Sequence, residues 1–210
     1  MTGIQARTRL IRLRVVTLAL MAFGPPGTSG WIEASAKGQE VPVTGPSRRM
    51  ADGKEWTVEN LDGGTASSYC YDGAQLNCSR YGRLHTWESA QLGCRSMGKG
   101  WRLPTEDDWR QLARHYGGAS EDSDDKGKAA YAALLIGGSS GFNALLGGGR
   151  SDAGEYRRLE AHGFYWTASE SGPATAWFYN FGKGGMALHR QREGAKQEAF
   201  SVRCVREWRP

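Results

Sequence analysis

Four cysteines could bind a metal ion or form disulfide bonds: Cys70, Cys78, Cys94 and Cys204. A structural zinc site needs close pairs such as C-x2-C, usually with histidine, whereas these cysteines lie 8, 16 and 110 residues apart. An even number of cysteines in an oxidising compartment predicts disulfide bonds instead. We therefore expect two bridges, and their pairing depends on the elements that carry the four residues.

The other candidates for catalysis or metal binding lack the spacing that such chemistry requires. Carboxylates occupy positions 106–108, directly after Thr105, where they suit a helix cap better than an acid–base pair. The acidic run 121–125 offers oxygen ligands for calcium, but its polar neighbours favour an exposed loop, so calcium binding stays open. No H-E-x-x-H string surrounds the histidines, which are His85, His115, His162 and His189. We predict no catalytic residue, no cofactor and no metal ligand.

The charge distribution excludes a nucleic-acid-binding protein. The formal net charge is +5, and residues 1–36 contribute +3 through four arginines and one glutamate. The remaining basic residues are interspersed with acidic ones, whereas nucleic-acid binding needs a clustered basic face. The glycine-rich string 147–150 also lacks the G-K-[ST] and the strand-to-helix context of a phosphate-binding loop.

The first 36 residues have the features of a secretory signal peptide. Arginines precede an apolar run at 15–23 that is too short to span a bilayer comfortably, and Ala34-Ser35-Ala36 fits a cleavage site. A cut near 27–30 is an alternative, as is a basic tail on a cytosolic protein. We predict that residues 37–51 form a linker and that residues 52–208 form one domain. We expect an exported protein, periplasmic, cell-surface or extracellular, with no stable membrane span after cleavage.

Helices are predicted in the first half of the domain. Apolar residues at 87–97 repeat at helical spacing after Thr86, a candidate N-cap. A second apolar stripe, at 109–116, follows Thr105 and its carboxylates, which is typical of a capped helix N-terminus. A third, shorter helix is predicted at 129–136.

Strands are predicted mainly in the last third of the chain. They are short, rich in aromatic residues and bounded by glycine or polar residues. The predicted strands lie at 164–168, 175–181, 186–190 and 200–205, with a further β-prone run ending at Val58. Helices followed by strands, without regular alternation, indicate the α+β class.

Several short strings recur in a characteristic order along the domain. The most specific are G-W-R-L-P-T at 100–105 and S-V-R-C-V at 201–205. The others include D-G-K-E-W at 52–56, Y-G-R-L-H-T-W at 81–87, Y-W-T-A-S at 165–169 and A-W at 176–177. Over roughly residues 52–207 this series resembles the family named the Fibrobacter succinogenes major paralogous domain.

The resemblance implies a fold and a compartment. The family is related to C-type lectin-like and formylglycine-generating-enzyme-like folds, so it implies two main helices packed on irregular antiparallel sheets. Its members resemble exported bacterial proteins, mostly uncharacterised. His85 stands where the family pattern usually has tyrosine, which argues against a general catalytic role for this histidine.

Two functions remain, and the sequence favours a non-catalytic binding or surface-interaction module with an unknown protein or glycan ligand. The alternative is an extracytoplasmic oxidase of the formylglycine-generating type, which works through a close pair of copper-binding thiols near its C-terminus. This chain has only Cys204 in that region.

Four tryptophans fall inside the family strings: Trp101, Trp109, Trp166 and Trp177. We therefore expect them in the core rather than on a ligand surface.

The predicted elements favour the pairs Cys70–Cys78 and Cys94–Cys204. The first pair spans a polar, glycine-containing segment that can turn back on itself. Cys94 lies on the apolar stripe of the first helix, and Cys204 shares a strand face with Phe200 and Val202. Both should therefore point into the same core.

The exported protein should lack residues 1–36, because a signal peptidase removes the segment that ends at Ala36. N-terminal sequencing of secreted protein measures this directly. An intact Met1 on exported protein would contradict the prediction and indicate an uncleaved anchor.

Overall fold

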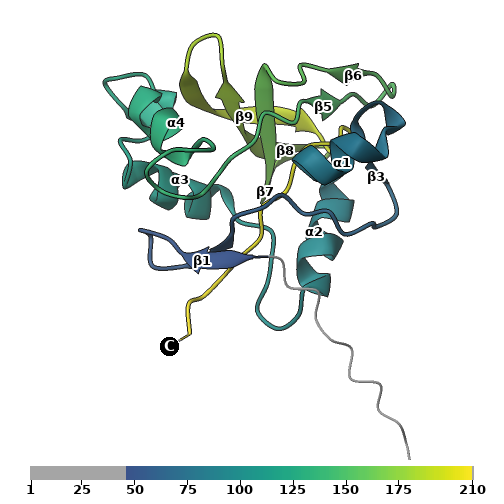
Figure 1. Ribbon diagram of the computed structural model, residues 1–210, viewed down its shortest axis with the longest axis horizontal. Helices are drawn as coiled ribbons and strands as arrows, with labels where there is room; N and C mark the ends of the chain where they lie inside the picture. The colour runs from purple at the N-terminus through teal and green to yellow at the C-terminus, as the bar shows by residue number, and fades with distance from the viewer. Residues whose placement is uncertain (1–45, 210) are drawn as a thin grey trace, which may run out of the picture. The chain divides into compact units, whose positions relative to one another are not determined.

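The computed structural model describes residues 46–209, which contain four α-helices and ten strands (Figure 1). The helices are α1 (Gln75–Tyr81), α2 (Trp87–Ser96), α3 (Glu106–Arg114) and α4 (Lys128–Leu134), with 3-10 turns η1 (Tyr71–Gly73) and η2 (Ser120–Asp122). The strands are β1 (Ser47–Arg49), β2 (Glu55–Thr57), β3 (Ser68–Tyr69), β4 (Leu84–His85), β5 (Gly149–Arg150), β6 (Tyr156–Arg157), β7 (His162–Gly172), β8 (Thr175–Gly182), β9 (Ala187–Ala195) and β10 (Val205–Arg206). The predicted signal peptide and residues 37–45 of the predicted linker lie outside the described residues.

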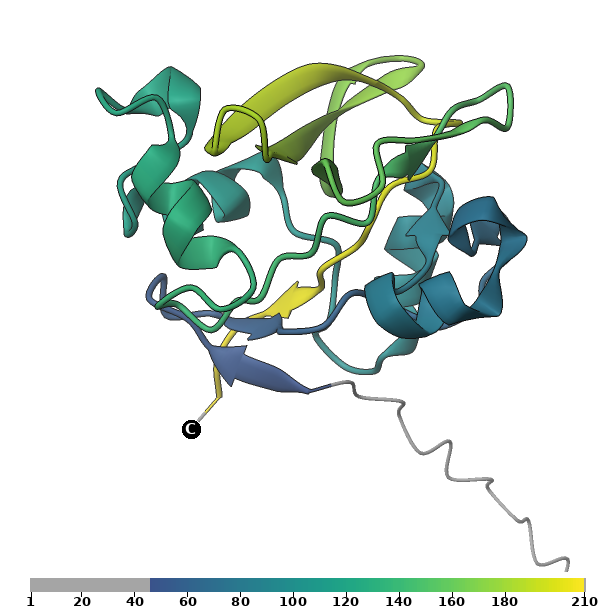
Figure 2. The ribbon, with the colours of Figure 1, turned by 45° about the horizontal axis from the view of Figure 1, so that its top comes forward.

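The strands form small antiparallel sheets rather than one large sheet. The sheet β7-β8-β9 is the main one, a second has the order β1-β2-β10, and β3-β4 and β5-β6 are two-stranded. Figures 1 and 2 show α3 and α4 on one side of the main sheet and α1 and α2 on the other. Within residues 46–209 the four helices precede the main sheet, which is the arrangement expected from the sequence.

The predicted strand at 200–205 is wrong as a continuous element. Only Val205 belongs to a strand, β10, while Phe200 and Ser201 make single bridges. The segment pairs in turn with His85 and Tyr165 before it reaches β2, so no single neighbour can extend a ladder along it. It therefore works as a connector that touches several elements.

The N-terminus of helix α3 has the threonine cap that the sequence predicted. The Thr105 hydroxyl accepts the N–H of Asp108 at 3.1 Å, and the Asp108 carboxylate accepts the N–H of Thr105 at 2.7 Å, which completes a capping box. Helix α2 begins after Thr86 as predicted, although the Thr86 side chain makes no cap bond. Helix α4 confirms the predicted third helix.

Helix α1 and strand β1 were not predicted. Helix α1 buries only Cys78 and Tyr81, so its sequence carries no apolar stripe. Strand β1 falls inside the segment predicted to be a linker, where it pairs with β2 and is followed by the buried Met50. Its arginines, Arg48 and Arg49, are exposed, which is why apolar periodicity is missing. The folded domain thus includes residues 46–51.

Aromatic rings fill the core between α3 and the main sheet. Trp109 of α3 is fully buried and stacks on Tyr179 of β8, with centroids 5.1 Å apart. Trp56 and Phe142 meet Trp109 edge to face at 5.3 and 5.4 Å. These geometries are the favourable ones for aromatic pairs, so the cluster fixes α3 against the sheet.

Two disulfides brace the domain in the predicted pairing, Cys70–Cys78 and Cys94–Cys204. Cys94 and Cys204 are fully buried and join α2 to the C-terminal segment across 110 residues. The chain-entropy model gives about 4.8 kcal/mol for a loop of that length and about 2.5 kcal/mol for the shorter one. The long-range bridge therefore contributes more to stability.

Arg203, beside Cys204, is fully buried and forms no ion pair within residues 46–209. Its guanidinium donates to the side-chain oxygen of Asn60 at 2.7 Å and to the backbone carbonyls of Thr57, Phe142 and Asn143 at 3.0, 2.7 and 2.6 Å. Burial lowers the pKa of Arg203 from its usual value. Four neutral oxygens and the ring faces of Phe142 and Tyr165, at 4.6 and 5.9 Å, surround the cation.

Candidate functional site

A pocket of about 240 Å³ lies between the β5–β6 hairpin and the strands β7–β9; we call it the aromatic pocket. Its lining residues are Gly149, Arg150, Ser151, Arg157, Arg158, Phe164, Phe178, Glu193, Glu198 and Phe200. Figure 1 shows the β5–β6 hairpin beside the main sheet. The volume is below the roughly 300–1,000 Å³ of drug-sized sites, so the pocket suits one unit of a larger ligand.

Three phenyl rings form the floor of the aromatic pocket. Phe164 and Phe178 project from neighbouring strands, and Phe200 comes from the C-terminal connector. The centroids lie 5.0 Å apart for Phe178–Phe200, 5.2 Å for Phe164–Phe200 and 6.0 Å for Phe164–Phe178. Phe200 is nearly buried, whereas Phe164 and Phe178 stay partly exposed to offer an apolar surface.

The β5–β6 hairpin brings arginine to the edge of this floor. A Cβ atom at Gly149 would lie 3.1 Å from both Phe164 and Phe200, so glycine allows the backbone to approach the rings. The next residue, Arg150, lies over the ring of Tyr69 at 4.1 Å. This cation–π contact holds the guanidinium in place without neutralising it.

Charged groups of both signs surround the pocket, with arginine in excess. Arg157 pairs loosely with Glu155 at 3.5 Å, whereas Arg150 and Arg158 form no ion pair within residues 46–209. Glu198 accepts the N–H of Ala195 at 3.1 Å, and burial raises its pKa. The rim thus offers hydrogen-bond donors and acceptors together.

Arg158 has a backbone conformation that arginine rarely adopts, with φ 65°. Its carbonyl accepts the N–H groups of Ala161 and His162 at 3.1 and 2.9 Å, and this turn fixes the strained residue at the pocket. A left-handed non-glycine residue costs of order 1 kcal/mol or more, and such strain concentrates at functional sites. Six other non-glycine residues among those described share a positive φ, so the conformation fixes where Arg158 lies and does not by itself assign it a function.

The structure does not bring together the residues that the sequence offered for acid–base chemistry. Helix α3 starts with Glu106, which pairs with Arg190 at 2.8 Å, and Asp108, which pairs with Lys54 at 3.0 Å. In the acidic run 121–125, Asp125 caps α4 by accepting the N–H of Ala129 at 2.7 Å. Within residues 46–209 no three His, Cys, Asp or Glu side chains cluster as metal ligands.

The histidines occupy separate places. His115 is exposed at the end of α3, His189 lies 3.7 Å from Glu121, and His162 stacks on Phe164 at 5.4 Å. The chain also contains one G-x-S-x-G string, 137–141, but it lies in the turn after α4 rather than between a strand and a helix.

The tryptophans follow the core prediction, with one exception. Trp101, Trp109 and Trp166 are buried. Trp177 is only half-buried, beneath the guanidinium groups of Arg190 and Arg192 at 5.5 and 6.0 Å.

The aromatic pocket was not predicted from the sequence, because its phenylalanines look like ordinary strand residues and its arginines lie in a turn without periodicity. The only sequence signal was the glycine–arginine string at 147–150.

The geometry defines a disulfide-braced α+β module with one arginine-rimmed aromatic pocket. The family model described as the Fibrobacter succinogenes major domain matches residues 44–206, so the chain belongs to this family. None of the curated proteins matches the chain. No helix among the described residues is long and apolar enough to cross a membrane.

His85 takes part in a buried hydrogen-bond network between β4, α2 and Leu61. It is fully buried on β4, where Nε2 lies 3.3 Å from the Leu61 carbonyl and Nδ1 lies 3.1 Å from the Ser89 hydroxyl. The carbonyl can only accept, so Nε2 carries the proton and Nδ1 accepts from the hydroxyl. Burial lowers the pKa of His85 to about 4, and the ring is therefore neutral at pH 7.

The lowered pKa of His85 predicts acid sensitivity with a defined window. The unfolded chain binds the proton near pH 6.5 and the folded chain only near pH 4, so stability is lost as the pH falls between these values. The loss should reach about 3 kcal/mol at pH 4. Urea unfolding at pH 7, 5.5 and 4 should show this slope in the wild type and a flatter one in His85→Gln. His115→Gln, at an exposed site, should keep the wild-type slope; equal slopes in all three proteins would contradict the assignment.

Proposed function

We propose that this chain is an exported, non-catalytic module that binds saccharides and holds one terminal, acidic sugar unit in the aromatic pocket. The observation that carries the proposal is the floor of three phenyl rings beneath a rim of three arginines. Export rests on the predicted signal peptide and is supported by the two disulfides, which persist in oxidising compartments.

A sugar ring matches both surfaces of the pocket. Its C–H face can lie on Phe164 and Phe178, where it gains dispersion contacts and leaves water. Its hydroxyl groups both donate and accept, and they require partners of both kinds when they are desolvated. Arg150 and Arg158 supply donors, while Glu193 and Glu198 supply acceptors.

The excess of arginine favours an acidic sugar over a neutral one. A guanidinium binds a carboxylate through two parallel N–H···O bonds, which are stronger than bonds to neutral groups. Arg150 and Arg158 have no competing carboxylate partner within residues 46–209. A uronic acid at the end of a glycan chain therefore fits the charge and the size of the pocket.

We also propose a specific fold type and the absence of a catalytic activity. We take the fold to be C-type lectin-like, or of the formylglycine-generating-enzyme type, on the basis of the family resemblance. The oxidase alternative would need two thiols near the C-terminus, and Cys204 is instead bonded to Cys94 in the core. No observation favours that reaction over binding.

Calorimetric titration should detect a glucuronate-terminated oligosaccharide and find its glucose-terminated counterpart at least about tenfold weaker, the usual value of one charge-assisted contact. Phe178→Ala and Arg158→Gly should each weaken binding by about tenfold or more. Arg158→Gly also suits the left-handed backbone, so its unfolding free energy should stay within about 1 kcal/mol of wild type.

Arg114→Gln, at an exposed position on α3, is the matched control and should bind like wild type. Equal affinity of all variants would move the site away from the aromatic pocket. Failure of wild-type protein to bind any acidic or neutral glycan on an array would reject saccharide binding altogether.

A further inference from the structure

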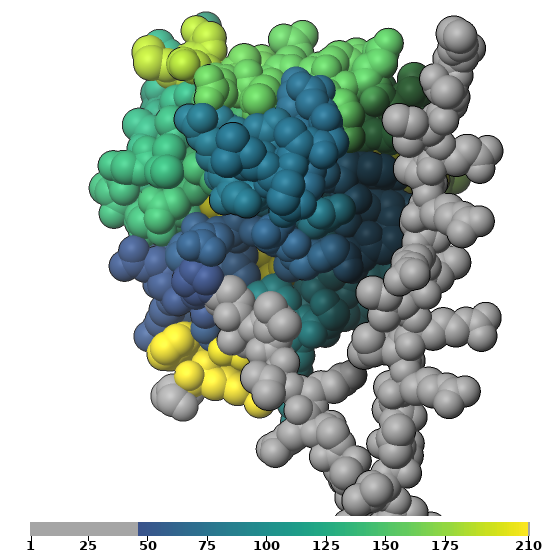
Figure 3. Space-filling model, turned by 45° about the vertical axis from the view of Figure 1, so that its right-hand side comes forward, coloured from purple at the N-terminus to yellow at the C-terminus, as the bar shows by residue number. Residues whose placement is uncertain are grey.

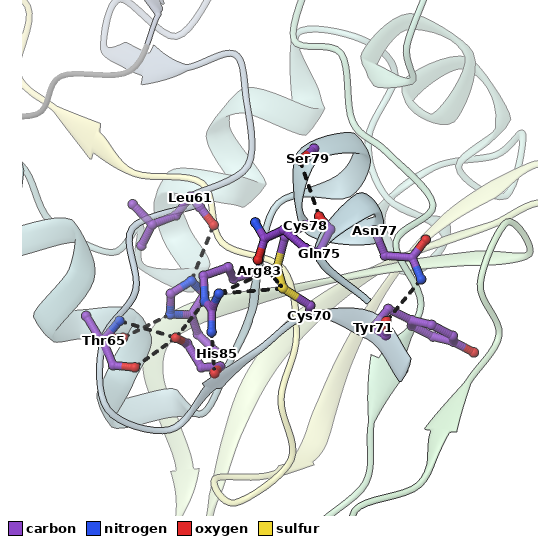
Figure 4. The surroundings of a disulfide bond; sticks show 11 residues. Leu61, Thr65, Cys70, Tyr71, Gln75, Asn77, Cys78, Ser79, Arg83 and His85 are labelled. Carbon is purple, nitrogen blue, oxygen red and sulfur yellow. Dashed lines mark hydrogen bonds between the residues drawn. A yellow bond between two sulfur atoms is a disulfide. The ribbon is translucent and has the colours of Figure 1, made fainter. Parts of the chain in front are cut away.

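The disulfide Cys70–Cys78 lies under a fixed positive charge. Figure 4 shows Arg83 directed at the bridge, with Nη1 3.6 Å from the Cys70 sulfur and 3.7 Å from the Cys78 sulfur. Arg83 is held there by Ser68, whose hydroxyl accepts from Nε at 2.9 Å and whose carbonyl accepts from Nη2 at 2.8 Å. No carboxylate within residues 46–209 pairs with Arg83, so its charge is available to the sulfur atoms.

The two cysteines of the bridge are themselves buried, with Cys70 8% and Cys78 1% exposed, but the segment that follows Cys70 is open to solvent. Residues 72–76 are exposed, and Leu76 of α1 is 78% exposed. Figure 3 shows α1 on the molecular surface below the β5–β6 segment. A cavity of about 410 Å³ beside α1 is lined in part by Cys78. An incoming molecule therefore has a path to this side of the domain.

The second disulfide has none of these features. Cys94 and Cys204 are fully buried in an apolar cluster with Trp166 and Phe200. The polar group beside this bridge is the carbonyl of Arg203, 3.9 Å from the Cys94 sulfur. A carbonyl oxygen would disfavour a thiolate, and the core excludes an attacking thiol. The Gln75 side-chain oxygen, 3.7 Å from the Cys70 sulfur, acts in the same sense at the first bridge, but there Arg83 contacts both sulfur atoms and offsets it. The two bridges thus differ in both access and electrostatics.

We propose that Cys70–Cys78 is a thiol–disulfide exchange site that takes the dithiol of a partner protein as its substrate. A thiolate of the dithiol attacks one sulfur atom, the S–S bond breaks, and the electron pair leaves with the other sulfur beside Arg83. The second thiol of the partner then resolves the mixed disulfide. In sum the partner dithiol is oxidised to a disulfide, Cys70 and Cys78 are reduced to thiols, and the two protons pass from the partner to these cysteines.

Arg83 promotes both the rate and the extent of this exchange. A cation beside the leaving sulfur stabilises the thiolate as it forms, and it stabilises the reduced pair relative to the uncharged disulfide. Reduction opens a loop of only eight residues, which restrains the unfolded chain weakly. The Cys94–Cys204 bridge stays closed, so the domain keeps its fold while η1 and α1 are released.

Release of α1 also alters the cavity beside it, because Cys78, Ser79 and Arg80 supply part of that lining. The exchange does not involve any lining residue of the aromatic pocket, so it can be tested without a saccharide. The site would thus report the redox state of its surroundings through one short surface segment.

The test uses the oxidised, folded protein with dithiothreitol as the dithiol, followed by alkylation and peptide mapping. We expect Cys70 and Cys78 to be labelled at least about tenfold faster than Cys94 and Cys204, because a cavity reaches Cys78 and Arg83 contacts both sulfur atoms, whereas the second bridge lies in an apolar cluster. In Arg83→Gln, both the rate and the equilibrium constant for reduction should fall by about fivefold or more, whereas Arg83→Lys should keep most of both.

Arg80→Gln is the matched control: it removes an arginine from α1 that pairs with Glu160, and it should change neither quantity more than about twofold. Simultaneous reduction of both disulfides in wild-type protein would overturn the proposal. So would wild-type kinetics and equilibrium in Arg83→Gln. If that variant fails to fold, the order of reduction in wild type still decides the question.

Discussion

The buried guanidinium of Arg203 is the constraint on which the rest of the domain depends. A buried cation that has no carboxylate partner is stable only if hydrogen-bond acceptors and aromatic faces surround it. Here Asn60, Thr57, Phe142 and Asn143 provide those oxygens from segments that lie far apart in the sequence. Each segment must reach its place before the charge is satisfied, so Arg203 couples the two ends and the middle of the domain at 46–209.

The C-terminal connector that carries Arg203 also organises the functional parts. Phe200 forms part of the floor of the aromatic pocket, and Cys204 is bonded to α2. The N–H of Cys204 donates to the Thr57 hydroxyl at 3.0 Å. Asn60 in turn donates to the carbonyl of Tyr81 at 2.7 Å, at the end of α1. Pocket, disulfide and surface helix are therefore positioned by one buried network.

Parts of the fold that depend on local chemistry could be predicted from the sequence. The Thr105 cap follows from neighbouring residues, and the Cys94–Cys204 bridge follows from two apolar faces that must meet. The connector 200–205 could not be predicted correctly, because its alternation resembles a strand while its partners come from different elements. Residue type alone does not show whether a segment meets one neighbour or several.

The aromatic pocket shows a second limit. Its rings and arginines come from the hairpin, two strands and the connector, and the turn that directs Arg158 requires a backbone conformation that no periodicity reveals. Arg203 itself lies in a recognisable string, S-V-R-C-V, but nothing local indicates that this arginine is buried while Arg206 is paired with Glu55 near the surface. Long-range packing decides between these roles.

Denaturant unfolding of Arg203→Met, with both disulfides intact, tests the central role of this network most directly. Methionine has a suitable volume but removes the donor from four oxygens, three of them on buried residues, so the free energy of unfolding should fall by about 3–5 kcal/mol. Arg206→Met, which removes a partly exposed ion pair, should cost about 1 kcal/mol or less. An Arg203→Met protein within about 1 kcal/mol of wild type would contradict the claim that the buried guanidinium holds the domain together.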